Sequence, residues 1–370
     1  MYSLQDYNYT LPDSLIAQTP ADPPESCKLL IYDKSSEVIQ DDIFSSLPDL
    51  IDPDTHIFFN NSKVLKARIP LSFDDWSWEV FYLKSIDKYR FEALVRPWKK
   101  FKIGSTLSFG DTSVEVEAMT EEWRILKSSK PILEVLEQYG NMPLPPYISY
   151  SQEKETPYQP VFASTPGSVA APTASLHFTK PLINSLQDLW VRISYTTLHV
   201  WLWTFKPVNT ENIKEYPIHA ERIVVEPWIF STLRYSKETK RPILAVGTTV
   251  TRTLESLPYL YVLLKNSDNV EANHYRNELT KEISLEEAQK IIWDIQLSGE
   301  SISFDSRVYI YPGFAFKIID QLITNFHLPK SSLLMLVAGL IGHEQLFKVY
   351  EHAIEQAYQF YSFGDAMWIR

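Results

Sequence analysis

Short apolar runs alternate with amphipathic segments along most of the chain, and this alternation predicts strands followed by helices. Runs with the composition of strands stand at 29–33, 56–64 and 243–246, and the run RVYIYPGFAF at 307–316 predicts a strand that ends at Pro312-Gly313. Segments with helical spacing or helix-start signals stand at 14–20, 41–51, 248–256, 284–295, 331–342 and from 345 onward. Strands that alternate with helices in this way are typical of an α/β fold.

The region from about Leu65 to Lys130 has a different pattern. Five segments there alternate apolar and polar residues with a period of two, at 67–73, 78–86, 89–95, 106–110 and 113–119. Their spacing of about ten residues predicts a small antiparallel sheet or barrel. A helix closed by glycine is expected to follow at 131–140.

Composition places the chain among ordinary globular proteins. Of its residues, 45% are hydrophobic and 22% are charged. Its length of 370 residues is enough for two or three domains. No apolar run approaches the roughly 20 residues of a membrane span, and the first ten residues lack the pattern of a signal peptide. The single cysteine, Cys27, excludes an internal disulfide. We therefore expect a cytoplasmic protein with no membrane partner.

The net charge of −11 argues against a protein that coats nucleic acid non-specifically. It leaves room for an RNA enzyme with a local basic face. Basic residues gather in two places that suit such a face: Lys63, Lys66 and Arg68, and then Arg96, Lys99, Lys100 and Lys102. Solvated lysine-rich hairpins explain the same residues equally well.

The most unusual stretch is Tyr158 to Phe178, YQPVFASTPGSVAAPTASLHF. Small residues dominate it, and Pro166 and Pro172 interrupt it with turns. Small residues let the backbone approach a ligand or another backbone. His177 stands near the end of the stretch and would place a titratable group in a binding pocket. A tight linker between domains is the alternative interpretation.

A second stretch, PILAVGTTVTRTLESL at 242–257, reads as a strand, a glycine turn and the start of a helix. Thr248 and Thr249 offer hydroxyl groups beside the free N–H groups of the helix N-terminus, which attract a carboxylate or a phosphate. An ordinary strand-to-helix crossover with a threonine cap is the alternative. No GxGxG turn follows an early strand, so the sequence excludes the class of methyltransferase that binds its cofactor at a glycine-rich turn of a Rossmann-like sheet.

Several histidines have candidate roles in acid–base chemistry, since imidazole titrates near neutral pH. The candidates are His177, His199, His219 and His327, and a hydrogen-bonded structural role is open for each of them. His219 and Glu221 form the best acid–base pair, because residues two apart on a strand face the same side. The eight histidines show no metal-binding spacing, so we expect no bound metal.

Long strings of the sequence resemble the S-adenosylmethionine:tRNA ribosyltransferase-isomerases of queuosine biosynthesis. Besides the stretch at 158–178, they are SLIAQTP at 14–20, NMPLPPYI at 141–148, AVGTTVTRTLES at 245–256, ITNFHLPKSSLLMLV at 323–337 and FGDAM at 363–367. The strings stand in the family's order and span essentially the whole chain. They are long and therefore specific.

The resemblance implies an α/β main domain of residues 1–64 and 141–370, with a barrel-like β domain inserted at 65–140. It implies transfer of the ribosyl part of S-adenosylmethionine to 7-aminomethyl-7-deazaguanine at the tRNA wobble position. The products would be epoxyqueuosine, adenine and methionine. The expected partners are tRNA and S-adenosylmethionine as co-substrate, and the expected state is a monomer.

The resemblance also implies the residues of the site. The four histidines above and Glu221 are the expected catalytic residues. The residues expected to bind S-adenosylmethionine are Thr173, Thr204, Gly247, Thr248, Thr249, Arg252, Asn325 and Asp365. Arg252 is alternatively an ordinary helix-surface residue. Basic residues of the inserted domain are expected to contact the tRNA backbone.

The chain departs from the family where tryptophan replaces glycine. Trp98, Trp201 and Trp203 stand at family glycine positions, Trp76 and Trp190 fit the same pattern, and Ser175 replaces another glycine. Three explanations are open: a catalytically inactive tRNA-binding relative, a loop rebuilt so that indoles stack on a base, or a UGA codon that the cell reads as glycine. The third requires UGA rather than UGG at these codons. A related enzyme acting on another acceptor is a further alternative.

Overall fold

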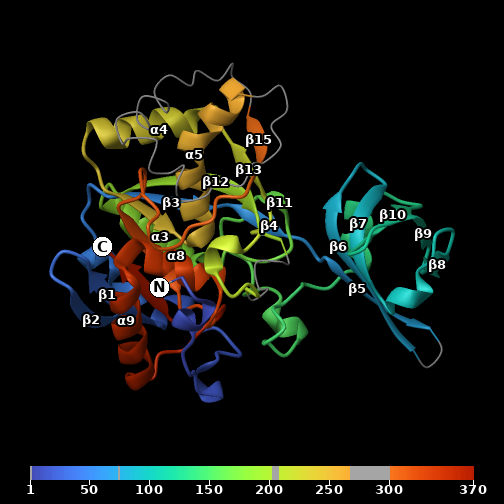
Figure 1. Ribbon diagram of the computed structural model, residues 1–370, viewed down its shortest axis with the longest axis horizontal. Helices are drawn as coiled ribbons and strands as arrows, with labels where there is room; N and C mark the ends of the chain where they lie inside the picture. The colour runs from blue at the N-terminus through green and yellow to red at the C-terminus, as the bar shows by residue number, and fades with distance from the viewer. Residues whose placement is uncertain (1, 74–75, 202–207, 267–300) are drawn as a thin grey trace.

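The computed structural model describes every residue of the chain except 1, 74–75, 202–207 and 267–300. A large part is built around a nine-stranded sheet, and a smaller part around a six-stranded sheet (Figure 1). A two-stranded parallel sheet, β4 (Ser62–Val64) with β11 (Thr165–Ser168), completes the strand pairing of the described residues.

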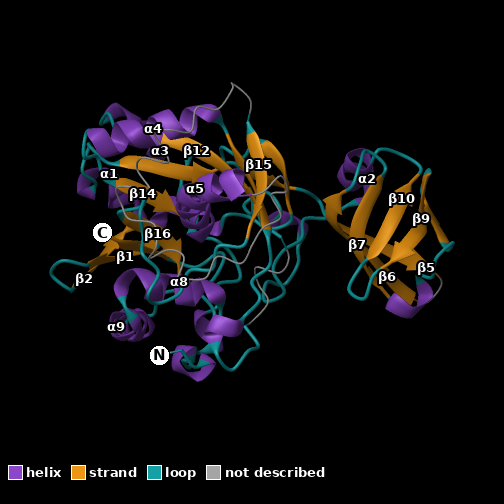
Figure 2. Ribbon diagram, turned by 45° about the horizontal axis from the view of Figure 1, so that its top comes forward, coloured by secondary structure: helices purple, strands orange, loops and turns teal. Residues whose placement is uncertain are grey.

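The nine-stranded sheet is mixed. Its central strands β12, β3, β14 and β16 run parallel, whereas β13 and β15 at one end and β17 and β2 toward the other include antiparallel pairings (Figure 2). In spatial order the strands are β15 (Ile302–Ser306), β13 (Glu221–Val225), β12 (Arg192–His199), β3 (His56–Asn60), β14 (Ile243–Val246), β16 (Gln321–Asn325), β17 (Ala366–Ile369), β1 (Lys28–Asp33) and β2 (Val38–Ile43).

Both faces of this sheet are buried in its middle, which explains why β14 is a continuous apolar run, ILAV, and why every residue of β3 is buried. In β3, Phe58 packs into one hydrophobic core, whereas Ile57 and Phe59 pack into the other. The Phe58 core includes residues of the helices α4 (Pro227–Glu238), α5 (Thr248–Asn266), α8 (Ser332–Ile341) and α9 (His343–Glu355). The opposite core includes residues of α1 (Leu47–Leu50) and α3 (Lys180–Asp188).

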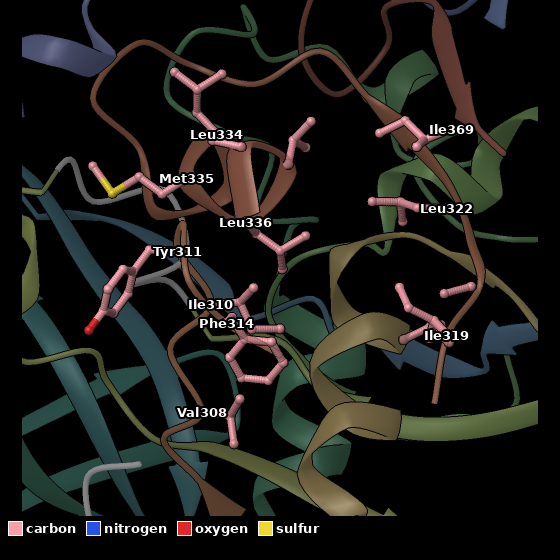
Figure 3. Close-up of a cluster of buried hydrophobic side chains, with 14 of the residues drawn as sticks. Val308, Ile310, Tyr311, Phe314, Ile319, Leu322, Leu334, Met335, Leu336 and Ile369 are labelled. Carbon is pink, nitrogen blue, oxygen red and sulfur yellow. The ribbon is translucent and has the colours of Figure 1, made fainter. Parts of the chain in front are cut away.

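The Phe58 core extends beyond the helices into a segment without regular structure. Tyr311 and Phe314 of that segment lie near Leu334, Met335 and Leu336 of α8 (Figure 3). This segment was predicted as a strand that ends at Pro312-Gly313, and the prediction is wrong because the strand, β15, ends at Ser306. The Ser306 hydroxyl accepts a hydrogen bond from the Val308 backbone N–H at 3.2 Å and so replaces a strand partner.

The six-stranded sheet is entirely antiparallel and curls into a half-barrel. Its strands, in spatial order, are β5 (Arg68–Phe73), β6 (Trp76–Ser85), β7 (Arg90–Arg96), β10 (Arg124–Ser128), β9 (Thr112–Met119) and β8 (Thr106–Phe109). Helix α2 (Ile132–Tyr139) adds Ile132, Val135 and Leu136 to its hydrophobic core. The predicted strands and helix of this region are confirmed. The end strands β5 and β8 do not pair, so the barrel does not close in the part of the chain that the structure describes.

The chain runs into and out of the six-stranded sheet at one crossing point. Arg68 and Asn141 form an antiparallel bridge there, with backbone N···O distances of 3.2 and 2.7 Å. Gly140 lies against the carbonyl oxygen of Lys66, and a Cβ at position 140 would overlap that oxygen. A glycine is therefore required for the two stretches of chain to touch.

Two predicted helices near the N-terminus are shorter than expected. The segment at 41–51 begins as the end of β2, continues as a 3-10 turn at Phe44–Ser46 and becomes helical only at Leu47. Ladder pairing with β1 overrides helix propensity at residues 41–43. In the segment at 14–20, only a 3-10 turn over Asp13–Leu15 forms. The helix predicted at 284–295 lies outside the described residues.

No single helix among the described residues is long and apolar enough to cross a membrane. Helices α8 and α9 have the length and apolar composition of a membrane span only when they are taken together, and the chain bends by 112° between them.

Candidate active site

One edge of the nine-stranded sheet carries most of the predicted site residues. The parallel strands β12, β3, β14 and β16 all end there, and the antiparallel neighbours β13 and β17 begin there. We call this the site edge, formed by Asn60, His199, Glu221, Val246, Asn325 and Ala366. Ligands bind outside the carboxyl ends of parallel strands in open α/β sheets, so the topology itself favours this edge.

A cavity opens at the site edge between segments far apart in the sequence. The chain from Val169 onward runs along it, because the Val169 N–H donates to the Val200 carbonyl oxygen at 2.9 Å. The cavity is lined by Tyr147, Ala171, Pro172, Thr173, Ala174, Val200, Gly247, Thr248, Thr249, Thr324, Asn325, Phe326, His327, Leu328, Pro329, Ser331, Leu333, Tyr361 and Ser362. Its lining includes five of the predicted binding residues and one of the predicted histidines.

The N-terminus of α5 forms one wall of the cavity. Gly247 precedes the helix with φ of +92°, a conformation that favours glycine, and it has no side chain to cap the first N–H groups. Thr248 and Thr249 line the cavity and are more than nine-tenths buried. The Thr249 hydroxyl oxygen is buried, and no residue in the described part of the chain forms a hydrogen bond with it. This wall therefore offers donors and an unsatisfied hydroxyl to a ligand.

The loop over Thr173–His177 forms the neighbouring wall. Thr173 Oγ1 donates to Asn325 Oδ1 at 2.8 Å, and Asn325 Nδ2 lies 3.1 Å from His177 Nε2. His177 Nδ1 lies 3.2 Å from the Cys27 sulfur. Burial lowers the pKa of His177 to about 4, so its imidazole is neutral near pH 7. Thr173 and Asn325 reach the cavity, whereas both ring nitrogens of His177 have protein partners.

Asp365 lies behind this cluster. Its carboxylate accepts hydrogen bonds from the backbone N–H groups of Lys28 and Gln359, both at 2.7 Å. Burial raises the pKa of this carboxyl group. Asp365 thus holds β1 and the C-terminal segment together and does not line the cavity.

His327 is the one predicted histidine that lines the cavity. Its Nε2 lies 2.8 Å from Thr324 Oγ1, and its backbone is held by the hydroxyl groups of Tyr350 and Tyr9. Burial lowers the pKa of His327 to about 3. A neutral imidazole fixed in this way can donate or accept a hydrogen bond in the cavity.

His199 ends β12 and lies next to Val200 on the site edge. Its Nδ1 is 2.8 Å from Ser62 Oγ, which is 2.6 Å from Ser168 Oγ. Gly167 packs against the imidazole so closely that a Cβ there would overlap the ring. Burial is the main cause that lowers the pKa of His199 to about 4, and Arg222 adds to it. His199 is therefore a tightly held neutral imidazole at the site edge.

His219 and Glu221 lie together, as predicted, with His219 Nε2 3.5 Å from Glu221 Oε1. The other carboxylate oxygen of Glu221 pairs with Arg252, and both partners of this ion pair are buried. Arg252 also donates from Nε to the Val308 carbonyl oxygen at 3.2 Å. The guanidinium that was predicted to bind an anion, or to lie on the helix surface, is engaged with a buried carboxylate.

The tryptophans differ in how well their positions accept a side chain. Trp190 follows α3 with φ of +65° and is 87% exposed, in the position where helices favour glycine. Trp98 packs under the Arg124 guanidinium, whose carbon lies 3.2 Å from the ring centre. The ring of Trp201 lies 5.4 Å from Lys84 Nζ of β6 and does not line the cavity.

Trp201 was predicted to share a strand face with His199 and to project into the ligand site. The strand on which that prediction rests does not reach Trp201, because β12 ends at His199 and the period-two alternation ends with it. The cavity at the site edge has no lining from Trp201. Trp203 and the predicted binding residue Thr204 lie outside the described residues.

The basic residues predicted to contact tRNA lie on or next to the six-stranded sheet. Arg96, Lys99, Lys100 and Lys102 are exposed. Lys66 and Arg68 instead form ion pairs with Glu137 and Glu79. Within the described part of the chain, no group of three acidic, histidine or cysteine side chains could hold a metal ion.

Sequence reasoning missed three residues of the site edge: Cys27, Ser62 and Ser168. Each contacts a predicted histidine directly or through one hydroxyl, across 106 to 150 positions of sequence. Cys27 was the only cysteine and could have been flagged on that ground. Ser62 follows Asn60-Asn61 at the end of a predicted strand, a place where polar residues often meet ligands.

The family model for queuosine biosynthesis proteins matches residues 4–369 of this chain. The chain is 36% identical over 378 residues to a protein of Desulfitobacterium hafniense and 37% identical over 377 residues to one of Treponema denticola, with 99% of each chain covered. Both relatives are named S-adenosylmethionine:tRNA ribosyltransferase-isomerase. The alternative of an inactive tRNA-binding relative gains no support from these names.

A solved structure gives the same result. The crystal structure of S-adenosylmethionine tRNA ribosyltransferase from Thermotoga maritima matches with a TM-score of 0.53 and 27% identity. The match covers 99% of this chain and 100% of that chain.

Proposed function

Because the chain belongs to the queuosine biosynthesis protein family and is an S-adenosylmethionine:tRNA ribosyltransferase-isomerase, we propose that its reaction takes place in the cavity at the site edge. The enzyme modifies tRNA and uses S-adenosylmethionine as co-substrate. The cavity and its wall residues are the proposed binding site for that co-substrate.

One observation carries this proposal. Four of the strings that resemble the family lie far apart in the sequence, yet each contributes to the lining of one cavity. They supply Ala171–Ala174, Gly247–Thr249, Thr324–Pro329 with Ser331, and Tyr147. Structural needs alone would spread such strings over the fold, whereas a shared ligand explains why they meet.

The reaction moves the ribosyl part of S-adenosylmethionine to 7-aminomethyl-7-deazaguanine at the tRNA wobble position and gives epoxyqueuosine. A base removes a proton that the neighbouring sulfonium makes acidic, adenine and methionine leave, and water must be excluded while the ring rearranges. The apolar part of the lining, with Phe326, Leu328 and Leu333, supports water exclusion. The N-terminus of α5 suits the methionine carboxylate or a tRNA phosphate.

His327 is the histidine best placed to meet the substrate, because it lines the cavity. His199 is the second candidate, because Val200 beside it lines the cavity and the Ser62 hydroxyl fixes its ring. The buried pair of Glu221 and Arg252 supports the site edge at β13. Which imidazole takes the proton is decided by comparing turnover of the His327→Gln and His199→Gln variants.

The six-stranded sheet is proposed to bind the tRNA backbone. Residues 65–140 would form a domain inserted into a main domain of residues 1–64 and 141–370. Two features support this: a hydrophobic core built almost entirely from residues 65–140, with Val169 added from the main part, and the bridge of Arg68 with Asn141 where the chain enters and leaves. We further propose that the enzyme acts in the cytoplasm, where its substrate tRNA is found. We also propose that it is a monomer.

The test is mass analysis of wobble nucleosides after incubation of the protein with precursor-containing tRNA and S-adenosylmethionine. Formation of epoxyqueuosine is expected, together with release of adenine and methionine. The assay is run in parallel with glycine at positions 201 and 203. Product from an alternative acceptor, or none from either form, would contradict the proposed reaction.

A further inference from the structure

A chain of four side chains runs from the interior to the cavity at the site edge. It begins at Cys27, passes through His177 and Asn325, and ends at Thr173. The first three are buried, with exposed fractions of 6%, 4% and 2%, and Thr173 lines the cavity. Buried polar groups that are fully paired fix one orientation of their neighbours.

The Asp365 carbonyl oxygen fixes the direction of this chain. Asn325 Nδ2 lies 3.5 Å from that oxygen and 3.1 Å from His177 Nε2, so the amide nitrogen donates toward both. If the amide were turned over, Asn325 Oδ1 would face the Asp365 carbonyl oxygen with no proton between them. His177 Nε2 is therefore an acceptor, and the proton of the neutral ring is on Nδ1, facing the Cys27 sulfur.

The same reasoning settles the hydroxyl group of Thr173. Because Asn325 Oδ1 points at Thr173, the hydroxyl donates its only proton to the amide oxygen at 2.8 Å. A hydroxyl whose proton is engaged has only lone pairs left. Thr173 Oγ1 thus presents an acceptor, and not a donor, to a ligand in the cavity.

The adjoining wall has the opposite character. The first N–H groups of α5 have no partner within the helix, and Gly247 provides no capping side chain. Among the described residues, the buried Thr249 hydroxyl has no hydrogen-bond partner. The walls are close together, since a Cβ built at Gly247 would lie 3.6 Å from Thr249 Oγ1 and 3.8 Å from the Ala174 Cβ.

An acceptor beside a group of donors matches an α-amino acid, which carries an ammonium and a carboxylate on one carbon. We propose that the methionine end of S-adenosylmethionine binds here, with its carboxylate at the N-terminus of α5 and its ammonium at Thr173 Oγ1. In this arrangement Cys27, His177 and Asn325 are positioning residues that keep Thr173 an acceptor. The inference rests on the proposed function, because it places the same co-substrate in the same cavity.

The neutral state of the chain agrees with this arrangement. Burial lowers the pKa of His177 to about 4 and raises the pKa of the Cys27 thiol. Neither group carries a charge near pH 7, so the direction of the hydrogen bonds does not change with pH around neutrality. His177 therefore has a role other than that of the base predicted from the sequence.

The test compares three compounds by calorimetric titration of the full-length protein, with a parallel set that has glycine at positions 201 and 203. The compounds are S-adenosylmethionine, its decarboxylated form, and an analogue whose amino group is replaced by hydrogen. Thr173→Val is expected to weaken the first two by about tenfold or more and to leave the deaminated analogue within about twofold. Thr173→Ser keeps the hydroxyl and is expected to bind all three normally.

Thr249→Val should give the complementary result. It is expected to weaken S-adenosylmethionine and the deaminated analogue, and to leave the decarboxylated form nearly unchanged. Thr253→Val is the matched control, because its buried hydroxyl bonds to the Thr249 carbonyl one turn along α5 and does not reach the cavity. Thermal unfolding of each variant establishes that it is folded.

The positioning role has its own readout. Cys27→Ala should reproduce the amino-group-specific loss of Thr173→Val at a smaller size, on the order of threefold, and Cys27→Ser should restore binding. Equal weakening of all three compounds by Thr173→Val would overturn the inference and leave the proposed function intact. Binding of S-adenosylmethionine that no cavity variant affects would overturn the proposed function itself.

Discussion

The two sheets differ in where they keep their polar groups. The nine-stranded sheet buries an ion pair, several imidazoles and a chain of hydrogen-bonded side chains at one edge. The six-stranded sheet places its ion pairs at or near the surface, as in Arg68 with Glu79 and Lys84 with Glu92. Buried polar networks are costly unless they are complete. Their concentration at the site edge therefore points to chemistry there, and the simpler sheet to a supporting or docking role.

Acidic pH should give the largest difference between the two sheets, because it should destabilise the nine-stranded sheet far more than the six-stranded sheet. Burial lowers the pKa of His56, His177 and His199 to about 4 and of His327 to about 3, and residues 65–140 contain no histidine. Between pH 6.5 and 4 the unfolded chain binds protons that the native imidazoles do not. The free energy of unfolding therefore falls with falling pH, by about 1.4 kcal/mol per unit for each histidine.

Hydrogen exchange at pH 7 and pH 5 measures this difference segment by segment. We expect protection in the nine-stranded sheet to fall by several kcal/mol while β5 to β10 change little. His56→Gln should reduce the pH dependence without disturbing the site edge, since the His56 imidazole bonds to Ser194 and Ser236 away from that edge. Parallel loss of protection in both sheets would show that they unfold as one unit.

Breaking one ion pair in each sheet gives the next largest difference. Arg252→Ala leaves the Glu221 carboxylate buried without its cation, which costs about 3–5 kcal/mol. Arg68→Ala removes the partner of Glu79, where the Arg68 side chain is 38% exposed, and should cost less than about 1 kcal/mol. Urea unfolding of both variants measures the two costs, and equal values would contradict the distinction between the sheets.

Removing two hydroxyl groups from the site edge should affect ligand binding more than stability. The double change Thr248→Ala and Thr249→Ala is expected to weaken S-adenosylmethionine by roughly tenfold, because the α5 N-terminus is proposed to hold its carboxylate. A loss of tRNA affinity with unchanged S-adenosylmethionine binding would show that the helix holds a phosphate instead. Titration with each ligand distinguishes these results. Unchanged affinity for both would remove the anion-binding role from this helix.

The six-stranded sheet should respond to changes in charge. Lys99→Gln with Lys102→Gln is expected to lower tRNA affinity a few-fold and to reduce the slope of its salt dependence by about 1.5. S-adenosylmethionine binding should not change, because these lysines are outside the cavity. An unaltered salt slope would show that the lysines only solvate the surface.

The smallest expected effect concerns a tryptophan. Trp190 occupies a left-handed conformation after α3, and Trp190→Gly should stabilise the protein by about 0.5–1 kcal/mol. Lys240 ends α4 in the same way, with φ of +54°, and Lys240→Gly is the matched control. Thermal unfolding of both variants gives the comparison. A destabilised Trp190→Gly variant would argue that tryptophan belongs at this position.

Much of the fold was predictable, because it depends on local periodicity. The strands of the six-stranded sheet follow a period of two, and β14 with α5 follows from an apolar run, a glycine turn and a threonine-rich helix start. The predictions failed where tertiary pairing overrides local signals. Residues 41–43 join β2, and residues 307–316 leave the sheet to fill the core.

The sequence indicated residues that meet at one cavity, and it indicated much less of how they connect to one another. Thr173, Thr248 and Asn325 were expected to meet, and they do line one cavity. Whether an imidazole reaches a substrate or another side chain depends on contacts across more than a hundred positions. His177 meets Cys27 in this way, and no short pattern in the sequence encodes that contact.

The contact of Gly140 with the Lys66 carbonyl has a consequence for how the protein is assembled and varied. It brings together the two ends of the segment between Lys66 and Gly140. For the rest of the chain, this long segment therefore connects two neighbouring points in space, as a tight turn does. Closing such a long loop costs conformational entropy, and the folding of residues 65–140 offsets this cost. We therefore expect a longer turn far from this contact, between two strands of the six-stranded sheet, to leave the register of the strands that hold the cavity unchanged.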